Sequence, residues 1–271
     1  MDKIKISDIL KKKDKEKITM LTCYDYSFAK ILDEAGVDII LVGDSLANVV
    51  LGMSETRKVS FGEMLNHTRA VAMGVERALV VADMPYVSYQ KDPKECAYYA
   101  KKFIEAGAQA VKVEWFRDCA YVVKRLIKNK IPVMGHIGLT PQTVHLLGGY
   151  KVQGKDEESA LNLIKQAKTL QDLGVFSIVL ECIPYQLASL ITEKLKIPTI
   201  GIGAGNKCDG QVLVLYDLLG LYKKIKPKFV RVYKDFYCEI KNTTLEFIKD
   251  VKKRKFPSRK ESFSCSKEFS C

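Results

Sequence analysis

Polar and charged residues follow short apolar runs at several points of this sequence. In "DIILVGDS" four apolar residues lead into a glycine, a carboxylate and a hydroxyl, and "RALVVADMP" repeats the pattern with another aspartate. The residues at such positions are Asp44, Ser45, Asp83, Lys112, Glu114, His136 and Glu181. Acids, a lysine and a histidine gathered in one place are suited to binding a metal ion or moving protons.

Taken singly, these residues have an ordinary structural explanation. Asp or Ser after a strand commonly caps the helix that follows. That explanation is reasonable for Asp44 or Asp83 alone, and it is much weaker for all of the residues together. The set as a whole indicates a shared site.

Several carboxylates can share one pocket only when something neutralises them. A hard divalent cation does this most directly, and magnesium typically takes one or two carboxylates together with water and substrate oxygens. Asp44 and Asp83 suit that arrangement, with Glu114 as a third or water-mediated ligand. The acids therefore predict a magnesium site.

Lys112 and Glu114 are two residues apart in an apolar run, so both side chains of a strand there point the same way. A lysine turned towards a metal site is a costly buried charge unless it meets an anion. Metal and lysine together favour a 2-oxo acid, whose enolate the metal would stabilise as a Lewis acid. Glu181 is the acid left over, and we expect it to be the base.

The elements that would position these residues repeat along the chain. Apolar runs alternate with amphipathic stretches of helical length that close on glycine, such as "DYSFAKILDEAG". The last run either forms a strand or is entirely helical. The runs cover residues 17–23, 36–45, 77–85, 108–114, 131–136, 174–181, 197–205 and 210–220.

Eight such units predict an α/β fold, with a parallel sheet covered by helices. Their number favours a closed (β/α)8 TIM barrel over an open doubly wound sheet, and no G-x-G-x-x-G follows the first run. Catalytic groups of such barrels project from the carboxyl ends of the strands, which is where the polar residues stand.

The size of the chain suits one large domain, since it has 271 residues of which 47% are hydrophobic. We expect a barrel domain over residues 1–263, with an N-terminal helix, and a short flexible extension over 264–271. No apolar run approaches the ~18 residues of a membrane helix. The N-terminus lacks the apolar segment of a signal peptide, so we expect a cytoplasmic protein.

The eight cysteines form no C-x-x-C pair. In a chain of this length and apolar content they are expected to be reduced thiols rather than disulfides, and they lack the paired spacing of a zinc site.

The net charge of +12 is concentrated at the C-terminus, where 15 basic and 6 acidic residues lie between Lys223 and Cys271. Such a basic tail could bind nucleic acid or an anionic membrane, which would make the protein an interaction module. No aromatic platform or nucleic-acid motif accompanies the lysines. We expect a solvated helix face and tail, with no nucleic-acid or membrane partner.

Longer stretches of the chain resemble the ketopantoate hydroxymethyltransferase family. The resemblance runs from about Ile6 to Phe263 and leaves only "SCSKEFSC" beyond the usual end of the family. It is carried by "LTCYDYSFAKILDEAGVDIILVGDSLANVVLG", "VVADMPYVSYQ", "VKVE", "GHIGLTPQ", "GGYKVQG", "VLECIP" and "IPTIGIGAGNKCDGQVLVLYDLLG".

The resemblance implies a (β/α)8 barrel that assembles as a cytoplasmic homodecamer. It implies transfer of a hydroxymethyl group from 5,10-methylenetetrahydrofolate to 3-methyl-2-oxobutanoate, which gives 2-dehydropantoate on the route to pantothenate and coenzyme A. No nucleic acid takes part. The expected partners are therefore two small molecules, with Mg2+ as the cofactor.

The family motifs also imply roles for single residues of this sequence. Asp44 and Asp83 would bind magnesium and contact the substrate, and Glu114 would complete or support the metal site. Ser45 and Lys112 would hold the oxo acid. The resemblance thus implies the same metal site as the strand ends.

The resemblance makes Glu181 the proton acceptor and His136 a supporting residue. A direct contact between His136 and the substrate is an equally good interpretation. The glycine-rich stretch 138–154 is either a lid over the site or a fixed loop at a subunit interface.

Three departures from the family pattern leave the expected metal and base residues unchanged. At Ala47-Asn48 the family usually has glycine in the first position. At Arg57-Lys58 it usually has Leu-Pro, and at Trp115-Phe116 a small Gly pair is common. The main alternative is a magnesium-dependent lyase or mutase of the phosphoenolpyruvate mutase/isocitrate lyase type. Such enzymes usually carry a K-K-C-G-H lid motif, which this sequence lacks.

Overall fold

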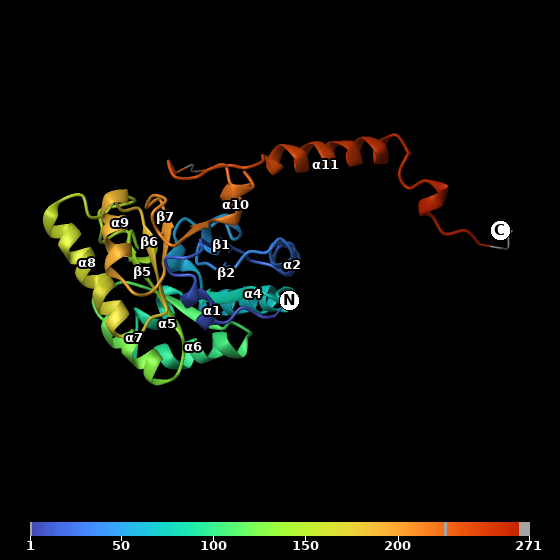
Figure 1. The fold of residues 1–271 in the computed structure, drawn as a ribbon. Coiled ribbons are helices and arrows are strands. Elements are labelled where there is room, and N and C mark those ends of the chain that lie inside the picture. The colour runs from blue at the N-terminus through green and yellow to red at the C-terminus, as the bar shows by residue number, and fades with distance from the viewer. Residues whose placement is uncertain (1, 225–226, 266–271) are drawn as a thin grey trace. The chain divides into compact units, whose positions relative to one another are not determined.

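Eight parallel strands close into a barrel in chain order, with β8 paired to β1. Figure 1 shows strands of this barrel with helices outside them. The computed structural model describes residues 2–224 and 227–265. The strands are β1 Ile18–Thr22, β2 Ile39–Val42, β3 Leu79–Asp83, β4 Ala110–Glu114, β5 Val133–Gly138, β6 Ser177–Glu181, β7 Thr199–Ile202 and β8 Gly210–Leu213. The predicted (β/α)8 barrel is confirmed.

Helices cover the outside of this barrel, and neighbours such as α2 and α4 or α6 and α7 pack against each other. The α-helices are α1 Ile6–Lys11, α2 Tyr26–Glu34, α3 Leu46–Val49, α4 Phe61–Gly74, α5 Tyr86–Tyr89, α6 Cys96–Glu105, α7 Cys119–Lys128, α8 Glu157–Asp172, α9 Tyr185–Lys194, α10 Leu215–Leu218 and α11 Phe236–Lys252. Short 3-10 turns are η1 Thr56–Lys58, η2 Pro93–Glu95, η3 Pro141–Thr143 and η4 Arg259–Glu261.

The predicted helix ends are confirmed by their glycines. Just after α2, α6 and α8, the glycines Gly36, Gly107 and Gly174 have φ of 90°, 103° and 94°, respectively. Residues other than glycine rarely adopt this backbone conformation. The last apolar run, residues 210–220, divides into strand β8 and the short helix α10. Neither a continuous strand nor a wholly helical segment forms there.

Alternate residues of each strand point into the barrel, and their chemistry changes from one end to the other. In β4 the inward sequence is Ala110, Lys112 and Glu114, and in β5 it is Met134 and His136. Ala110 and Met134 belong to the buried apolar cluster. The carboxyl ends of these strands therefore hold the polar side chains above an apolar floor.

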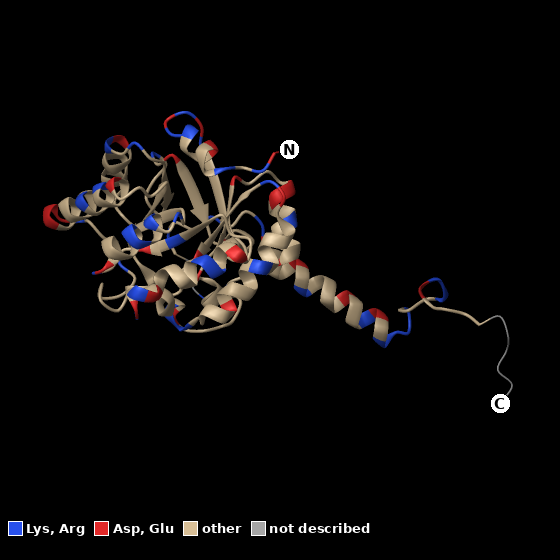
Figure 2. Ribbon diagram, turned by 90° about the horizontal axis from the view of Figure 1, so that it is seen from below, with Lys and Arg blue, Asp and Glu red and all other residues tan. Residues whose placement is uncertain are grey.

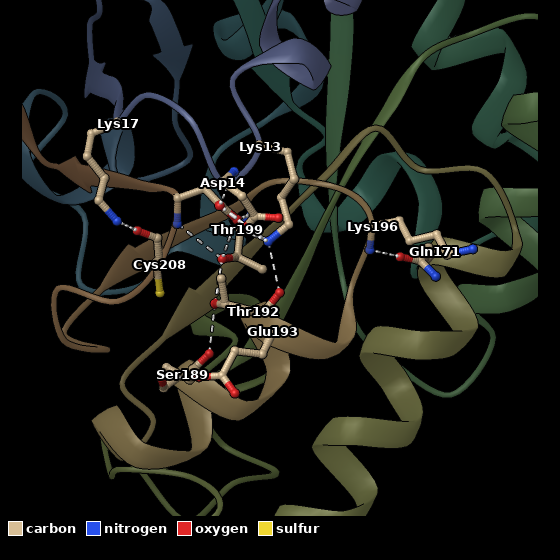
Figure 3. A network of polar contacts seen from close by, with 12 residues as sticks. Lys13, Asp14, Lys17, Gln171, Ser189, Thr192, Glu193, Lys196, Thr199 and Cys208 are labelled. Carbon is tan, nitrogen blue, oxygen red and sulfur yellow. Dashed lines mark hydrogen bonds and ion pairs between the residues drawn. The ribbon is translucent and has the colours of Figure 1, made fainter.

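The opposite, amino-terminal end of the barrel is closed by α1 and the turn after it. Ile9 of α1 is fully buried in the same apolar cluster. Lys13 Nζ lies 3.0 Å from Asp209 Oδ2, and their side chains are 9% and 5% exposed. That carboxylate also accepts hydrogen bonds from the backbone N and Oγ1 of Thr199. Figure 3 shows Lys13, Thr192 and Thr199 converging in this network.

The described residues form two compact units. The first is the barrel, which runs to Leu215 and includes Pro227–Val230. The second contains α11 and all of α10 except its first residue. No residue of α11 is buried, and basic and acidic residues are interspersed along it (Figure 2). A single domain over 1–263 stays a prediction. Most of the predicted extension, 264–271, lies outside the described residues.

The cysteines in the described part of the chain are all free thiols. Among the same residues no helix is long and apolar enough to cross a membrane.

The Lys13–Asp209 pair predicts a large loss of stability on mutation. Asp209→Ala removes the acceptor of a buried ammonium and of two Thr199 donors, so we expect unfolding free energy to fall by about 3 kcal/mol. Asp172→Ala breaks only the exposed pair with Lys168 and should change the unfolding free energy by less than about 0.5 kcal/mol. Urea denaturation measures both; equal losses would contradict the assignment.

Candidate active site

The seven residues predicted from the sequence lie at the carboxyl ends of five neighbouring strands. Asp44 and Ser45 follow β2, and Asp83 is the last residue of β3. The remaining residues are Lys112 and Glu114 of β4, His136 of β5 and Glu181 of β6. Ser45 and Glu181 are partly exposed and the other five are buried.

Asp44 and Asp83 are joined directly, since the backbone N of Asp44 donates to Asp83 Oδ2 over 3.1 Å. Gly43 leaves room for the hydroxyl of Ser45 at this strand end. A Cβ at Gly43 would lie 3.6 Å from Asp83 Oδ2 and only 3.0 Å from Ser45 Oγ. Two of the predicted metal ligands are therefore brought together by a tight strand end.

Lys112 is the cation of the site. Its Nζ lies 2.6 Å from Asp83 Oδ1 and 3.2 Å from His136 Nδ1. Burial alone would lower the pKa of Lys112, but the carboxylates of Asp83, Glu114 and Asp44 raise it above its ordinary value. Lys112 therefore stays an ammonium, and its predicted orientation into the barrel is confirmed.

His136 links Lys112 to Glu181. Burial, together with the charge of Lys112, holds the pKa of His136 well below its ordinary range, so the imidazole is neutral. We assign the Nε2–H tautomer because Nδ1 must accept from the lysine. Nε2 then faces Glu181 Oε2 at 3.2 Å. Nε2 makes no hydrogen bond at this contact, and the supporting role of His136 stays a prediction.

Glu181 has the pKa of a base that works near neutral pH. Burial raises its pKa to about 7, against the lowering effect of Lys112. At neutral pH a large fraction of this carboxyl is ionised and able to accept a proton.

The other acids are buried with too few partners. Burial raises the pKa of Asp83 to about 7 and that of Glu114 well above its ordinary value, and Asp44 adds repulsion to both. Glu114 Oε1 accepts no hydrogen bond, and its nearest basic atom is His136 Nδ1 at 3.6 Å. Asp83 Oδ1 contacts Lys112 Nζ without hydrogen-bond geometry. Oxygens in this state fit a cation.

These carboxylates suit a cation that also takes ligands from outside the protein. Among the described residues no three His, Cys, Asp or Glu side chains are gathered as a ready metal cage. Magnesium suits such a site because it usually keeps one or two carboxylates and completes its shell with water or substrate oxygens.

The helix-cap alternative is wrong for Ser45, Asp83 and Glu181. Ser45 occupies the N-cap position of α3, but its side chain makes no capping hydrogen bond. Its Oγ lies 2.8 Å from Tyr24 Oη, and that hydroxyl donates to Thr22 Oγ1. The helices after β3 and β6 have prolines at the N-cap, not Asp83 or Glu181.

Two residues of the site were not predicted, Gln142 and Tyr89. Gln142 lies in η3, after β5, and contacts both Glu114 and Asp44. Tyr89 ends α5 and donates to Gln142. Both stand inside motifs that carry the family resemblance, "GHIGLTPQ" and "VVADMPYVSYQ", but neither residue type signals a role on its own.

A cavity of about 250 Å³ lies among the segments after β4 and β5 and the first half of α8. Trp115, Phe116 and Leu147 line part of it. The stretch 138–154 contributes to the wall, and its first part is buried at η3 whereas Tyr150 is 63% exposed. The choice between a lid and a fixed interface loop stays open.

Solved structures with the same fold are enzymes of small acids. A phosphonopyruvate hydrolase, in complex with oxalate and Mg2+, superposes with a TM-score of 0.62 at 12% identity, over 96% of this chain and 93% of that one. A phosphoenolpyruvate phosphomutase from Streptomyces platensis subsp. rosaceus gives 0.63 at 12% identity, over 92% and 88%. Identities this low show the fold alone.

Sequence relatives are much closer. The 3-methyl-2-oxobutanoate hydroxymethyltransferase of Carboxydothermus hydrogenoformans is 50% identical over 99% of this chain and 98% of its own. The enzyme of the same name from Clostridium botulinum strain Langeland is 53% identical over 92% and 90%. The family model described as ketopantoate hydroxymethyltransferase matches residues 3–259. The chain belongs to the ketopantoate hydroxymethyltransferase family.

Proposed function

We propose that the protein is an enzyme that transfers a hydroxymethyl group from 5,10-methylenetetrahydrofolate to 3-methyl-2-oxobutanoate, with Mg2+ as cofactor. One observation carries the proposal: a buried ammonium stands among three buried carboxylates, beside a fourth whose pKa is near neutrality. This is the equipment needed to bind an anion together with a cation and to remove a proton from it. Family membership and relatives near 50% identity support the choice of reaction.

Asp44 and Asp83 would hold the magnesium ion, with Glu114 directly or through water. When bound, the cation supplies Lewis acidity that makes the carbon next to a keto group more acidic. The fold relative crystallised with oxalate and Mg2+ supports this, since oxalate presents two adjacent oxygens much as a 2-oxo acid does. Lys112 and Ser45 would bind the substrate carboxylate.

Glu181 would take the proton from C3 of 3-methyl-2-oxobutanoate. Neutral His136, held by Lys112, presents its Nε2 side to Glu181 and would help to orient that carboxylate. A new carbon–carbon bond to the one-carbon unit of the folate then replaces the lost C–H bond. With one water, the products are 2-dehydropantoate and tetrahydrofolate.

A cytoplasmic location and a homodecameric assembly belong to this proposal as expectations from the family. The second candidate is an oxo-acid lyase or mutase, favoured only by the shared barrel fold.

The reaction itself is tested by supplying both substrates. We expect 2-dehydropantoate to form from 3-methyl-2-oxobutanoate and methylenetetrahydrofolate with Mg2+, and to stop when a chelator removes the metal, because the acids lose their counter-charge. Mass spectrometry of the product measures this. No 2-dehydropantoate with any divalent metal would contradict the proposal, and cleavage of the oxo acid instead would favour the lyase.

Glu181→Gln tests the base. We expect exchange of the C3 hydrogen of 3-methyl-2-oxobutanoate for solvent deuterium to fall at least 100-fold. In the unmutated protein the rate should rise with pH and level off above about 7, because only the carboxylate form of Glu181 accepts a proton. Proton NMR follows the exchange. Glu193→Gln, at an exposed site on α9, is the matched control. Unchanged exchange in Glu181→Gln would remove this residue as the base.

Metal addition should stabilise the folded protein. Binding to the native state alone raises the melting temperature, so millimolar Mg2+ should raise it in the unmutated protein. The double variant Asp44→Asn/Asp83→Asn should show no rise, because both predicted ligands lose their charge. Asp172→Asn, on the surface of α8, should respond like the unmutated protein. An equal rise in all three would place the cation elsewhere.

A further inference from the structure

Gln142 is buried at the centre of the carboxylate cluster, with an exposed fraction of 1%. Its backbone N donates to Glu114 Oε2 over 3.1 Å. Its side-chain Nε2 donates to Asp44 Oδ2 and to the carbonyl of Met84, each over 3.0 Å. One residue from the segment after β5 thus contacts two acids at the carboxyl ends of other strands.

The orientation of the Gln142 amide is fixed by Tyr89. The hydroxyl of Tyr89 accepts from the backbone N of Glu114 over 3.1 Å and from Gln90 Nε2 over 2.9 Å. Its single proton is left for Gln142 Oε1, 2.9 Å away. Gln90 Nε2 also donates to Oε1, over 3.0 Å. In a flipped amide the NH2 group would face the donors of Tyr89 and Gln90. The amide oxygen would face the Met84 carbonyl and the Asp44 carboxylate, so only one orientation is stable.

These donors leave each acid with one oxygen tied and one directed elsewhere. Asp44 Oδ2 and Glu114 Oε2 accept from Gln142, and Asp83 Oδ2 accepts from the backbone of Asp44. Glu114 Oε1 has no hydrogen-bond partner. A carboxylate held at one oxygen presents the other in a defined direction, which lowers the cost of ordering it around a cation.

We infer that Gln142 is a positioning residue for the acids that bind the metal, and that Tyr89 locks the Gln142 amide in the orientation that this requires. Gln142 touches neither the substrate nor the cation in this role. Phe116 packs edge-on against the Tyr89 ring, with centroids 5.4 Å apart, and so holds that ring in place. The inference rests on the proposed metal site and adds a residue that the sequence did not indicate.

Metal affinity without substrate is the decisive measurement. Gln142→Met keeps most of the side-chain volume and loses all four side-chain hydrogen bonds. We expect it to weaken Mn2+ binding roughly 10–100-fold, measured by the electron paramagnetic resonance signal of free Mn2+. The apparent KM for Mn2+ should rise by a similar factor, while kcat at saturating Mn2+ falls less.

Tyr89→Phe provides a second, milder variant that keeps the ring and its contact with Phe116. It should weaken Mn2+ binding in the same direction, since the amide loses its lock. The double variant should lose less Mn2+ affinity than the two single losses combined, because Tyr89 acts partly through the Gln142 amide and partly through the Glu114 backbone N. Gln171→Met, on α8 at the other end of the barrel (Figure 3), is the matched control and should bind Mn2+ normally.

The outcomes separate this inference from the proposed function. If folded Gln142→Met binds Mn2+ within twofold of the unmutated protein, the role of Gln142 is overturned and the proposed reaction still stands. If Gln142→Met does not fold, the same result in Tyr89→Phe has the same consequence. Failure of the unmutated protein to bind Mn2+ at all would overturn the metal site and this inference together.

Discussion

The barrel mouth buries more negative than positive charge, and most features of the site follow from this imbalance. Asp44, Asp83, Glu114 and Glu181 face one ammonium, that of Lys112. Burial raises the pKa of Asp83 and of Glu181 to about 7, so these acids are held in a state that favours protonation or a further cation. An anionic substrate adds one more negative charge, and it can enter only when positive charge enters as well.

Buried acids at the two ends of the barrel differ in whether the protein itself satisfies their charge. At the amino-terminal end Asp209 is paired with Lys13 and accepts backbone and hydroxyl donors, so its charge is satisfied within the fold. At the carboxyl end Glu114 keeps a buried oxygen without a donor. Gly138 lets β5 lie against Glu181, since a Cβ there would come within 2.2 Å of the Glu181 carbonyl. The fold thus stabilises one end and leaves the other poised for ligands.

Much of this could be predicted from sequence because parallel strands bury both faces and leave their signature as apolar runs. The step of two residues from Lys112 to Glu114 placed both on one face of a strand, and the metal site predicted for Glu114 turned that face into the barrel. Gln142 could not be predicted, because its contacts join the ends of three strands and depend on the path of the loop after β5. The run at 210–220 was ambiguous because an apolar segment suits a strand and a short helix equally. The solvated helix face expected near the C-terminus agrees with α11, which has no buried residue.

The site should accept an oxo acid only together with a divalent cation, and calorimetric titration tests this most directly. The protein is titrated with 3-methyl-2-oxobutanoate, without folate, in chelator and in saturating Mg2+. The charge imbalance predicts at least tenfold tighter binding with the metal, and an equal gain in metal affinity when the oxo acid is present, since such coupling is reciprocal. Equal affinity for the oxo acid with and without Mg2+ would contradict the account.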